Sequence, residues 1–494
     1  MYYESTRDSN IKINSANAIL KGLSDDGGLF VMKSLSDKKI DIKNLINKDY
    51  YEMGIEITKI FLPDFTENEI KNCIYNAYSN KFETNTLVPI KNLKNAYIAE
   101  LFNGPTSAFK DFGLLLLSQF MKTSLIKTNS KQNILILTAT SGDTGKAALE
   151  GFKDVDRIKV MVFYPNDGVS KVQELQMKTQ EGKNLYVASI NGNFDDAQSG
   201  IKKIFTDEKF KNKLKKYNLT LSSANSINIG RLIPQILYYF YVYIQLVKTS
   251  QINLYDKINF VVPTGNFGNI LAGYMAKKIG LPINKLICAS NENNVLYDFI
   301  NTGIYDKNRE FKKTISPSMD ILISSNLERL LYYICDEDTN YINKLMHNLN
   351  KYGKFNIEKK YLEKIQSEFI SGFATDDETK KIINKIYNEK QYLLDTHTAV
   401  AYKVFLDNNF ENKTVILQTA SPYKFVKDVY SSIFTDKIEN ELELMNKLFE
   451  KTNINIPNNL KNLNQKEIRF NDIIEKNKID EYIIKIIGEK YDNN

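Results

Sequence analysis

The chain has 494 residues, more than one hydrophobic core usually holds, so two or three domains are expected. Hydrophobic residues make up 43% and charged residues 25%, which are ordinary values for a folded protein and exclude a disordered chain. The net charge of +7 comes from 66 basic and 59 acidic residues without a basic block, so no nucleic-acid partner is expected.

Cysteine usage and hydropathy indicate a reducing, cytoplasmic setting. Cys73, Cys288 and Cys335 have neither the number of a disulfide framework nor the spacing of a metal site. The N-terminus lacks the basic stretch and apolar run of a signal peptide. The longest apolar run, Leu232–Val247, contains polar residues and is too short to span a bilayer. We therefore expect a buried helix there, no membrane partner and no bound metal.

The first 95 residues alternate helical patterns with turns and show no catalytic spacing. Asp25–Val31 is typical of a tight turn that leads into a strand. Apolar residues recur at helical spacing over Leu45–Leu62 and Glu67–Tyr78, which predicts two amphipathic helices.

From residue 96 onward, strand patterns alternate with helical patterns. The sequence predicts a buried helix over Leu114–Lys127 and, after about residue 435, a charged helical segment; 301–390 is largely helical and carries no motif. The predicted strands are Tyr97–Leu101, Ile134–Leu137, Val160–Tyr164, Leu185–Ile190, Ile258–Val262, Leu286–Ser290 and Val415–Leu417. This alternation predicts an α/β fold whose ligands bind at the carboxyl ends of mostly parallel strands.

One lysine stands out by its neighbours. Lys110 lies between Phe109 and Phe112, shortly after the chain-breaking pair Gly104-Pro105. Burial among aromatic rings lowers the pKa of a lysine and makes it the stronger nucleophile that Schiff-base chemistry requires. The alternative is a surface lysine whose aliphatic stem lies over apolar neighbours.

Three stretches at predicted helix starts offer groups that bind anions. Backbone N–H groups of Gly265–Asn269 converge at a helix start, as in a phosphate cradle, although such a turn can also bind nothing. Thr140–Gly145 suits a carboxylate or merely caps a helix. Asn225–Arg231 suits a phosphate, or it is a capped helix followed by a surface arginine.

The two histidines give no support for a metal site. His347 and His397 are far apart in the sequence and lack the spacing of metal ligands. We expect His397, which follows Asp395 and precedes a helical run, to cap or pack a helix.

An activated lysine, a glycine cradle and a hydroxyl at the end of a late strand together describe a pyridoxal-phosphate enzyme. The sequence resembles the threonine synthase family, of fold type II in the tryptophan synthase β-like superfamily, in five stretches that keep the family's order. They are Asp25–Val31, Leu101–Phe112, Leu137–Gly145, Ser223–Arg231 and Pro263–Asn269, with a looser sixth at Thr419–Phe425. The resemblance covers the chain from the N-terminus to about residue 430.

The resemblance implies a division into domains: an additional N-terminal domain over 1–95, a large pyridoxal-phosphate-binding α/β domain over 96–125 and 226–435, a small α/β domain over 126–225 and a helical C-terminal extension over 436–494. It also implies site residues. Those implied to bind the cofactor are Lys110 as Schiff base and proton shuttle, Asp143 near the 3′-oxygen, Gly265, Asn266, Phe267, Gly268 and Asn269 at the phosphate, and Thr419 at the pyridine nitrogen. Those implied to bind the substrate are Ser141, Gly142 and Thr144 at its carboxylate, and Asn225, Ser226, Asn228 and Arg231 at its phosphate.

The implied reaction converts O-phospho-L-homoserine and water to L-threonine and phosphate, the last step of threonine biosynthesis, in a monomer or homodimer. Two alternatives stay open: a phospho-lyase that releases 2-oxobutyrate, and a binding protein that keeps the fold without catalysis. Ser421 stands where the family pattern Thr-Ala-His-Pro has histidine, so no imidazole role is carried over to this position.

Overall fold

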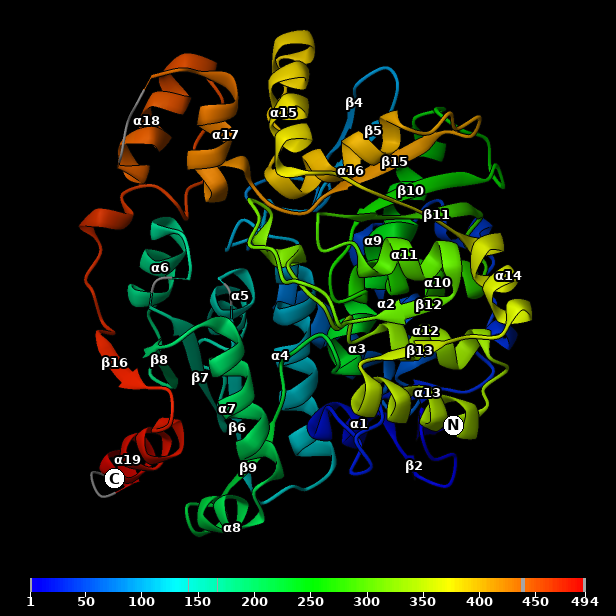
Figure 1. Cartoon of the computed structure of the whole chain (residues 1–494). Helices are drawn as coiled ribbons and strands as arrows, with labels where there is room; N and C mark the ends of the chain where they lie inside the picture. The colour runs from blue at the N-terminus through cyan, green and yellow to red at the C-terminus, as the bar shows by residue number, and fades with distance from the viewer. Residues whose placement is uncertain (1, 141, 167, 437–439, 492–494) are drawn as a thin grey trace.

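The computed structural model describes residues 2–140, 142–166, 168–436 and 440–491 of the chain (Figure 1). Two larger sheets, in which all or nearly all strands run parallel, are each packed against helices, and a small antiparallel sheet lies near the N-terminus. The predicted α/β fold with two open, mostly parallel sheets and an additional N-terminal part is therefore confirmed.

The N-terminal part combines a short sheet with three helices. The strands pair antiparallel in the order β2-β1-β3, with bounds β1 (Tyr3–Ser5), β2 (Lys12–Ile13) and β3 (Phe30–Met32). The helices are α1 (Ser15–Lys21), α2 (Tyr50–Phe61) and α3 (Glu67–Tyr78). Helix α2 begins later than the predicted Leu45, because the side chains of Asp49 and Glu52 form a capping box at its start. Both predicted ends of α3 are confirmed.

The large sheet has six strands in the order β14-β11-β10-β15-β5-β4, and only β4 runs antiparallel to its neighbour. Their bounds are β4 (Ile90–Asn92), β5 (Tyr97–Glu100), β10 (Ile258–Pro263), β11 (Ile283–Ser290), β14 (Phe369–Phe373) and β15 (Thr414–Gln418). The division into four domains stays a prediction, but the pairing of β4 with β5 shows that the large sheet takes in residues before 96.

The small sheet has five parallel strands in the order β16-β8-β7-β6-β9. Their bounds are β6 (Asn133–Ala139), β7 (Ile158–Pro165), β8 (Leu185–Asn191), β9 (Leu219–Ser222) and β16 (Asp472–Glu475). The helices that belong to this part are α5 (Asp143–Gly151), α6 (Lys171–Lys178), α7 (Phe194–Thr206), α8 (Glu208–Lys216) and α19 (Ile479–Tyr491).

The C-terminal segment is not only the helical extension that the sequence predicts over 436–494. Helix α18 (Glu441–Thr452) and α19 are helical as expected, but β16 between them pairs with β8 at the edge of the small sheet. This strand is short and mostly exposed, so it lacks the buried apolar alternation by which a strand is recognised in a sequence.

The segment 301–390, to which the sequence assigned no motif, also contributes to the large sheet through β14. Its other elements are the end of α11 (Val295–Thr302), the antiparallel pair β12 (Ile304–Asp306) and β13 (Lys354–Asn356), and helices α12 (Leu327–Ile334), α13 (Thr339–Tyr352), α14 (Lys359–Glu368) and α15 (Asp376–Lys390). Helices α16 (Thr396–Leu406) and α17 (Val426–Ile433) follow. This part is therefore mixed in secondary structure, not merely helical.

Helix α4 (Lys110–Lys127) lies between the small sheet and the rest of the molecule (Figure 1). It begins four residues before the predicted Leu114, at Lys110 itself, and packs against α1, α3, α5 and α9 (Ile229–Lys248). The predicted helix at Leu232–Val247 is the buried α9. In the described ranges, no helix is both long and apolar enough to cross a membrane.

Candidate active site

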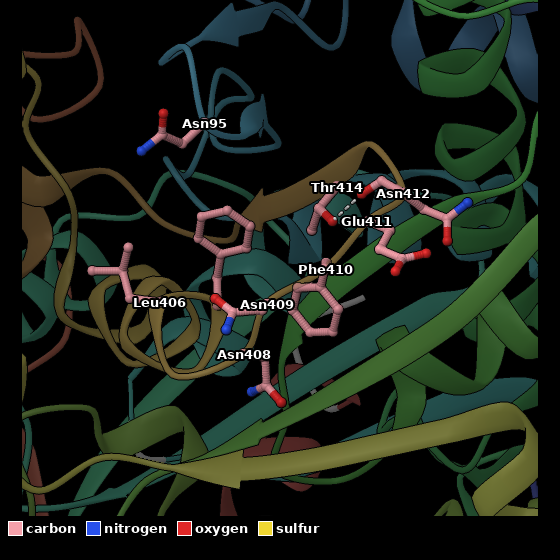
Figure 2. A pocket seen from close by; sticks show the side chains of 9 residues that line it. Asn95, Leu406, Asn408, Asn409, Phe410, Glu411, Asn412 and Thr414 are labelled. Carbon is pink, nitrogen blue, oxygen red and sulfur yellow. Dashed lines mark hydrogen bonds between the residues drawn. The ribbon is translucent and has the colours of Figure 1, made fainter.

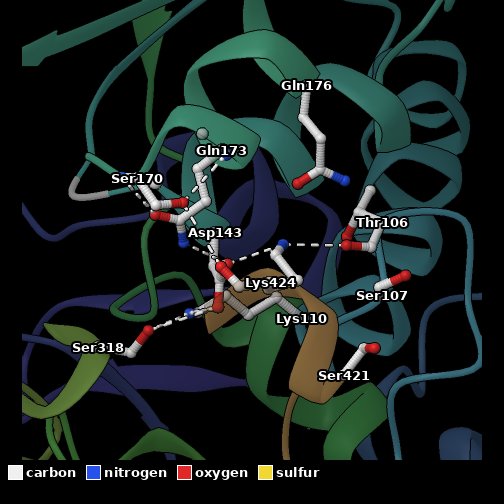
Figure 3. A network of polar contacts seen from close by, with 12 residues as sticks. Thr106, Ser107, Lys110, Asp143, Ser170, Gln173, Gln176, Ser318, Ser421 and Lys424 are labelled. Carbon is white, nitrogen blue, oxygen red and sulfur yellow. Dashed lines mark hydrogen bonds and ion pairs between the residues drawn. The ribbon is translucent and has the colours of Figure 1, made fainter. Parts of the chain in front are cut away.

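Lys110 is buried at the first position of α4, with only 9% of its surface exposed, which excludes the surface alternative. Its Nζ lies 3.3 Å from Oδ2 of Asp143 and 3.2 Å from Oγ of Ser318 (Figure 3). Burial lowers the pKa of Lys110; the charge of Asp143 opposes this shift, and those of Arg231 and Lys424 reinforce it. The site therefore makes the neutral, nucleophilic amine easier to form than it is for a lysine in water.

Asp143, the first residue of α5, is shared by two lysines. Its Oδ1 lies 2.7 Å from Nζ of Lys424 and accepts a hydrogen bond of 2.9 Å from Nε2 of Gln173 (Figure 3). Burial raises the pKa of Asp143, but the charges of Lys424 and Lys110 outweigh burial and hold the pKa well below its usual range. Asp143 is therefore a permanent anion beside the Lys110 amine.

Lys424 is a site residue that the sequence reasoning missed. It lies in the short turn Pro422–Phe425 that follows β15, and its side chain is wholly buried. Besides Asp143, its Nζ contacts the carbonyl oxygen of Thr106 at 2.9 Å, in the turn that precedes Lys110. The stretch Thr419–Phe425 contains a signal for it, because Lys424 lies between the aromatic residues Tyr423 and Phe425.

The turn Gly265–Asn269 leads from β10 into α10 (Gly268–Lys278), with Phe267 in the left-handed region at φ 61°. Oδ1 of Asn269 accepts hydrogen bonds from the hydroxyls of Tyr238 at 2.6 Å and Tyr239 at 2.9 Å. This fixes the amide so that its buried Nδ2 has no hydrogen-bond partner in the part of the chain described. An unpaired buried donor at a helix N-terminus suits a bound anion.

Arg231 lies in the first turn of α9, and its Nη1 donates to the carbonyl of Ala224 at 3.0 Å. Among the described residues, no carboxylate pairs with this guanidinium, and burial lowers its pKa to about 10. A buried cation without a counter-charge is costly unless an anion binds there. Arg231 packs against Gly113, one turn from Lys110, where a Cβ atom would lie 3.0 Å from Cγ of Arg231.

The other predicted residues of the turn Asn225–Arg231 differ in the hydrogen-bonding groups that they leave free for a ligand. Asn228 caps α9: its Oδ1 accepts from Gly230 N–H, and its Nδ2 donates to the carbonyls of Ile19 and Ser223, so the amide is already engaged by backbone. The side chain of Asn225 has no hydrogen-bond partner in the described ranges, and Oγ of Ser226 lies 3.4 Å from that of Ser325. Asn225 and Ser226 thus keep groups for a ligand, whereas Asn228 shapes the turn.

In the turn before α5, Thr140 caps the start of the helix. Oγ1 of Thr140 accepts the N–H groups of Gly142 at 3.0 Å and Gly145 at 2.9 Å, as in the capping alternative. Gly142 has φ 129°, which other residues rarely adopt, and Thr144 lies in the first turn of α5. Ser141, predicted to bind a carboxylate, lies outside the described residues.

Thr419 follows β15, and its carbonyl accepts the N–H of Phe109 at 2.8 Å, directly before Lys110. Its hydroxyl has no hydrogen-bond partner within the described ranges, so this group is free to meet a ligand. Ser421, in contrast, accepts the N–H of Tyr423 at 3.3 Å and caps the following turn. A serine at position 421 thus has a structural function of its own.

His397 packs in the first turn of α16, as predicted, with its ring 4.7 Å from that of Phe425. It also does more than pack. Its Nδ1 lies 3.0 Å from Oδ1 of buried Asp395, and its Nε2 accepts the N–H of Ser318 at 3.1 Å. His397 therefore helps to hold Ser318 against Lys110, a contact between distant segments that no local pattern indicates.

One hollow of the described surface lies away from the predicted site residues. It encloses about 400 Å³ beside Phe405, Phe410 and Glu411, and none of its lining residues is a predicted site residue (Figure 2). Nearer to Lys110, the turn at Gly265 lies close to the segment of Ser318, because a Cβ atom on Gly265 would lie 2.8 Å from the carbonyl oxygen of Ser318. Among the residues described, no cluster of His, Cys, Asp and Glu could hold a metal ion.

Comparison with known proteins identifies the family. The family model for the threonine synthase N terminus matches residues 2–78, and that for pyridoxal-phosphate dependent enzymes matches residues 83–342. Threonine synthase of Saccharomyces cerevisiae is 35% identical over an alignment that covers 98% of either chain. The chain belongs to the threonine synthase family. The family predicted from the sequence is thus confirmed.

Solved structures of the family have the same fold over the whole chain. A pyridoxal-phosphate-bound threonine synthase from Brucella melitensis is 35% identical, with a TM-score of 0.87 over 98% of this chain and 99% of that one. The yeast enzyme is 33% identical, with a TM-score of 0.88 over 99% of each chain. Human "Threonine synthase-like 1" is 40% identical over 85% of this chain, which spans only 58% of the length of that relative.

The residues present fit pyridoxal phosphate. A buried lysine with a lowered pKa suits its aldehyde, and the unpaired Nδ2 of Asn269 at the start of α10 suits its phosphate. The free hydroxyl of Thr419 follows β15, next to β10 in the sheet, so these groups gather at the carboxyl ends of neighbouring strands.

Proposed function

We propose that this protein is a threonine synthase that converts O-phospho-L-homoserine and water to L-threonine and phosphate. The observation that supports this substrate most directly is Arg231, a buried guanidinium without a carboxylate partner in the described ranges, close to the Lys110 amine. Together with the separate cradle Gly265–Asn269, it supplies a second anion site beside Lys110. Two such sites suit a phosphorylated cofactor and a phosphorylated substrate.

Pyridoxal phosphate would be held by Lys110 through a Schiff base, by Gly265–Asn269 at its phosphate and by Thr419 at the pyridine nitrogen, with Asp143 near its 3′-oxygen. When bound, the cofactor supplies an electron sink that acidifies the C–H bonds of the amino acid. The neutral hydroxyl of Thr419 differs from a carboxylate partner because it does not stabilise a protonated pyridine nitrogen.

The protein's own groups would orient the substrate at both ends. Arg231, Asn225 and Ser226 bind the γ-phosphate, supported by the cap that Asn228 forms on α9. Ser141, Gly142 and Thr144 bind the carboxylate, with Gly142 and Thr144 at the positive end of α5. Because both ends of the substrate are fixed, Cα is directed toward Nζ of Lys110.

Lys110 would carry the protons. Its Nζ takes the proton from Cα, and after loss of a Cβ proton the phosphate leaves as an anion, which Arg231 stabilises. A proton is then added at Cγ, and water adds its hydroxyl at Cβ to give threonine. Throughout, Lys424 keeps Asp143 in place and charged beside Lys110.

We further propose that the enzyme works in the cytoplasm as a monomer or homodimer and binds neither nucleic acid nor membrane. The scattered cysteines and the even mixture of basic and acidic residues support this setting.

Product identification tests the proposed function. The protein reconstituted with pyridoxal phosphate is incubated with O-phospho-L-homoserine, and released phosphate and amino-acid products are quantified. We expect one threonine for each phosphate. Release of 2-oxobutyrate with the phosphate would identify a phospho-lyase instead. A protein that stays colourless with the cofactor and releases no phosphate would be a non-catalytic member of the fold.

A further inference from the structure

A short segment before α12 contacts both predicted phosphate-binding turns. Oγ of Ser324 donates to the carbonyl of Gly265 at 2.7 Å. The backbone N–H of Asn326 donates to the carbonyl of Asn266 at 3.0 Å. Its side-chain Nδ2 donates to the carbonyls of Asn266 at 3.2 Å and Ser226 at 3.1 Å. One amide group thus joins the cofactor turn to the substrate turn.

Ser325 adds a side-chain contact between the same two turns. Its Oγ donates to Oδ1 of Asn266 at 3.2 Å and lies 3.4 Å from Oγ of Ser226. Each of the three residues 324–326 therefore contacts at least one of the turns.

Arg329 fixes the orientation of the Asn326 amide. Its Nη1 donates to Oδ1 of Asn326 at 2.6 Å, which turns the NH₂ group of that amide toward the two loop carbonyls. Its Nη2 donates to the carbonyl of Ile227 at 2.5 Å, within the substrate turn, and its Nε to the carbonyl of Phe30 at 3.0 Å. Asn326 and Arg329 are both wholly buried. Three fixed donors of one guanidinium thus connect three segments.

The N-terminal sheet supports α12 from its other side. Glu328 accepts hydrogen bonds from Nε of Arg7 at 2.9 Å, from Nη2 of Arg7 at 2.8 Å and from Oγ1 of Thr6 at 2.5 Å. The hydroxyl of Tyr333 donates to the carbonyl of Met32 at 3.1 Å. These contacts, with that of Phe30, hold α12 to β3 and to the two residues that follow β1.

We propose that Asn326 and Arg329 are positioning residues that set the separation between the turns Gly265–Asn269 and Asn225–Arg231, and that the N-terminal sheet braces them through α12. The proposal rests on the proposed function in that the two turns bind two phosphates. Small displacements of binding groups cost much of their effect, so a rigid connection between the turns keeps both phosphates in register with Lys110.

Asn326→Asp tests the proposal without removing the partner of Arg329. The carboxylate still accepts from Arg329, but it replaces the NH₂ group and opposes the carbonyls of Ser226 and Asn266. We expect the Kd of the apoenzyme for pyridoxal phosphate and the KM for O-phospho-L-homoserine each to rise about tenfold, with kcat changed less than about threefold. Arg329→Lys keeps the charge but loses the planar set of guanidinium donors, so it is also expected to raise this Kd and this KM.

Two further variants separate positioning from general stability. Ser324→Ala removes only the contact with Gly265, so it raises the Kd for pyridoxal phosphate by about threefold and leaves KM unchanged. Arg157→Met is the matched control, because Arg157 also donates to Asn133 and to two backbone carbonyls but contacts neither turn. We expect it to lower Tm and to leave both Kd and KM unchanged.

Cofactor affinity is measured by spectroscopic titration, which needs no turnover. It therefore tests the connection between the turns even if the product is not threonine. A folded Asn326→Asp protein with unchanged Kd and KM, or with only a lower Tm, would overturn the proposal. If that variant does not fold, unchanged Kd and KM in a folded Arg329→Lys protein would overturn the proposal instead.

Discussion

Lys424 lies with its Nζ 2.7 Å from Oδ1 of Asp143, and both side chains are buried. The charge of Lys424 also lowers the pKa of Lys110, on the other side of the same carboxylate. We predict that Lys424→Met raises the pKa of Lys110, because one neighbouring positive charge is lost and Asp143 acts on Lys110 alone. The midpoint pH of holoenzyme formation should therefore increase. This midpoint is measured by the visible absorbance of the bound cofactor.

The matched control for Lys424→Met is Lys427→Met, at an exposed position of α17. It should leave this pH dependence unchanged. Because Lys424→Met breaks a buried ion pair, we also expect a loss of about 3–5 kcal/mol in the free energy of unfolding. An unshifted pH dependence in a folded Lys424→Met protein would show that Lys424 does not tune the amine.

Lys110→Ala removes the amine that is proposed to bind the cofactor. We expect loss of the visible absorbance of the Schiff base and of all threonine formation, with the fold intact by circular dichroism. Retained turnover would show that Lys110 is not the residue that binds the cofactor. Lys146→Ala is a useful comparison, because Lys146 is also a buried lysine with a lowered pKa, but it pairs with Glu150 and not with Asp143.

Arg231 is proposed to bind the substrate phosphate and not the cofactor. Arg231→Ala should therefore weaken binding of O-phospho-L-homoserine by roughly 2–4 kcal/mol, seen as a higher KM, while the Kd for pyridoxal phosphate changes much less than this KM. Arg231→Lys should be intermediate, because the charge remains and the bidentate geometry is lost. An unchanged KM in the alanine variant removes Arg231 from the substrate site.

Asp111, next to Lys110, gives a prediction on pH. Burial raises the pKa of Asp111 to about 6 from 3.8, although hydrogen bonds from Thr106 oppose this. Between these values the folded state keeps a proton that the unfolded state has lost, so this group makes the fold less stable as pH rises through the window. At about 1.4 kcal/mol per pKa unit, this group lowers the free energy of unfolding by about 3 kcal/mol above pH 6.

Asp111→Asn removes that titration and still hydrogen-bonds to Thr106. Urea unfolding at pH 4, 5, 6 and 7 should show that the stability of the variant relative to the original protein increases across this range. Parallel pH curves for the two proteins would contradict the raised pKa of Asp111.

Asn269 offers a test of the cofactor turn alone. Asn269→Asp keeps an oxygen for Tyr238 and Tyr239 but replaces the buried Nδ2 with a second oxygen near the expected phosphate. We expect the Kd for pyridoxal phosphate to rise tenfold or more, about 1.4 kcal/mol, and the Tm of the apoenzyme to fall, because the buried carboxylate has no counter-charge in the described ranges. An unchanged Kd would show that Nδ2 does not face the cofactor.

Local patterns predicted most of the central strands and several helices, because buried strands and amphipathic helices leave periodic signals over adjacent residues. Phe109 and Phe112 favoured burial of Lys110 but left the surface alternative open, which only the fold excludes. The surroundings of Lys110 did not follow from the sequence, since Ser318 contacts Lys110 and Lys424 pairs with Asp143 from segments more than 200 residues away.

Contacts between distant segments also explain why the roles of other residues could not be predicted from the sequence. Asn228 has the residue type of a ligand, but contacts with Ile19 and Ser223 give it a structural function that its own neighbours in sequence do not indicate. Arg329 lies in 301–390, where no motif was found, because its function depends on carbonyls of Phe30 and Ile227. Backbone acceptors are present at every residue, so they leave no signal in a sequence.

Strand β16 determines when folding of the small sheet can finish. Asn191 at the end of β8 bonds to Glu475 in β16, and these residues are 284 positions apart in the chain. During synthesis, the edge of β8 must therefore stay unpaired until most of the polypeptide has left the ribosome. An open strand edge is a template for other chains, so the nascent small sheet is exposed to intermolecular pairing throughout this interval.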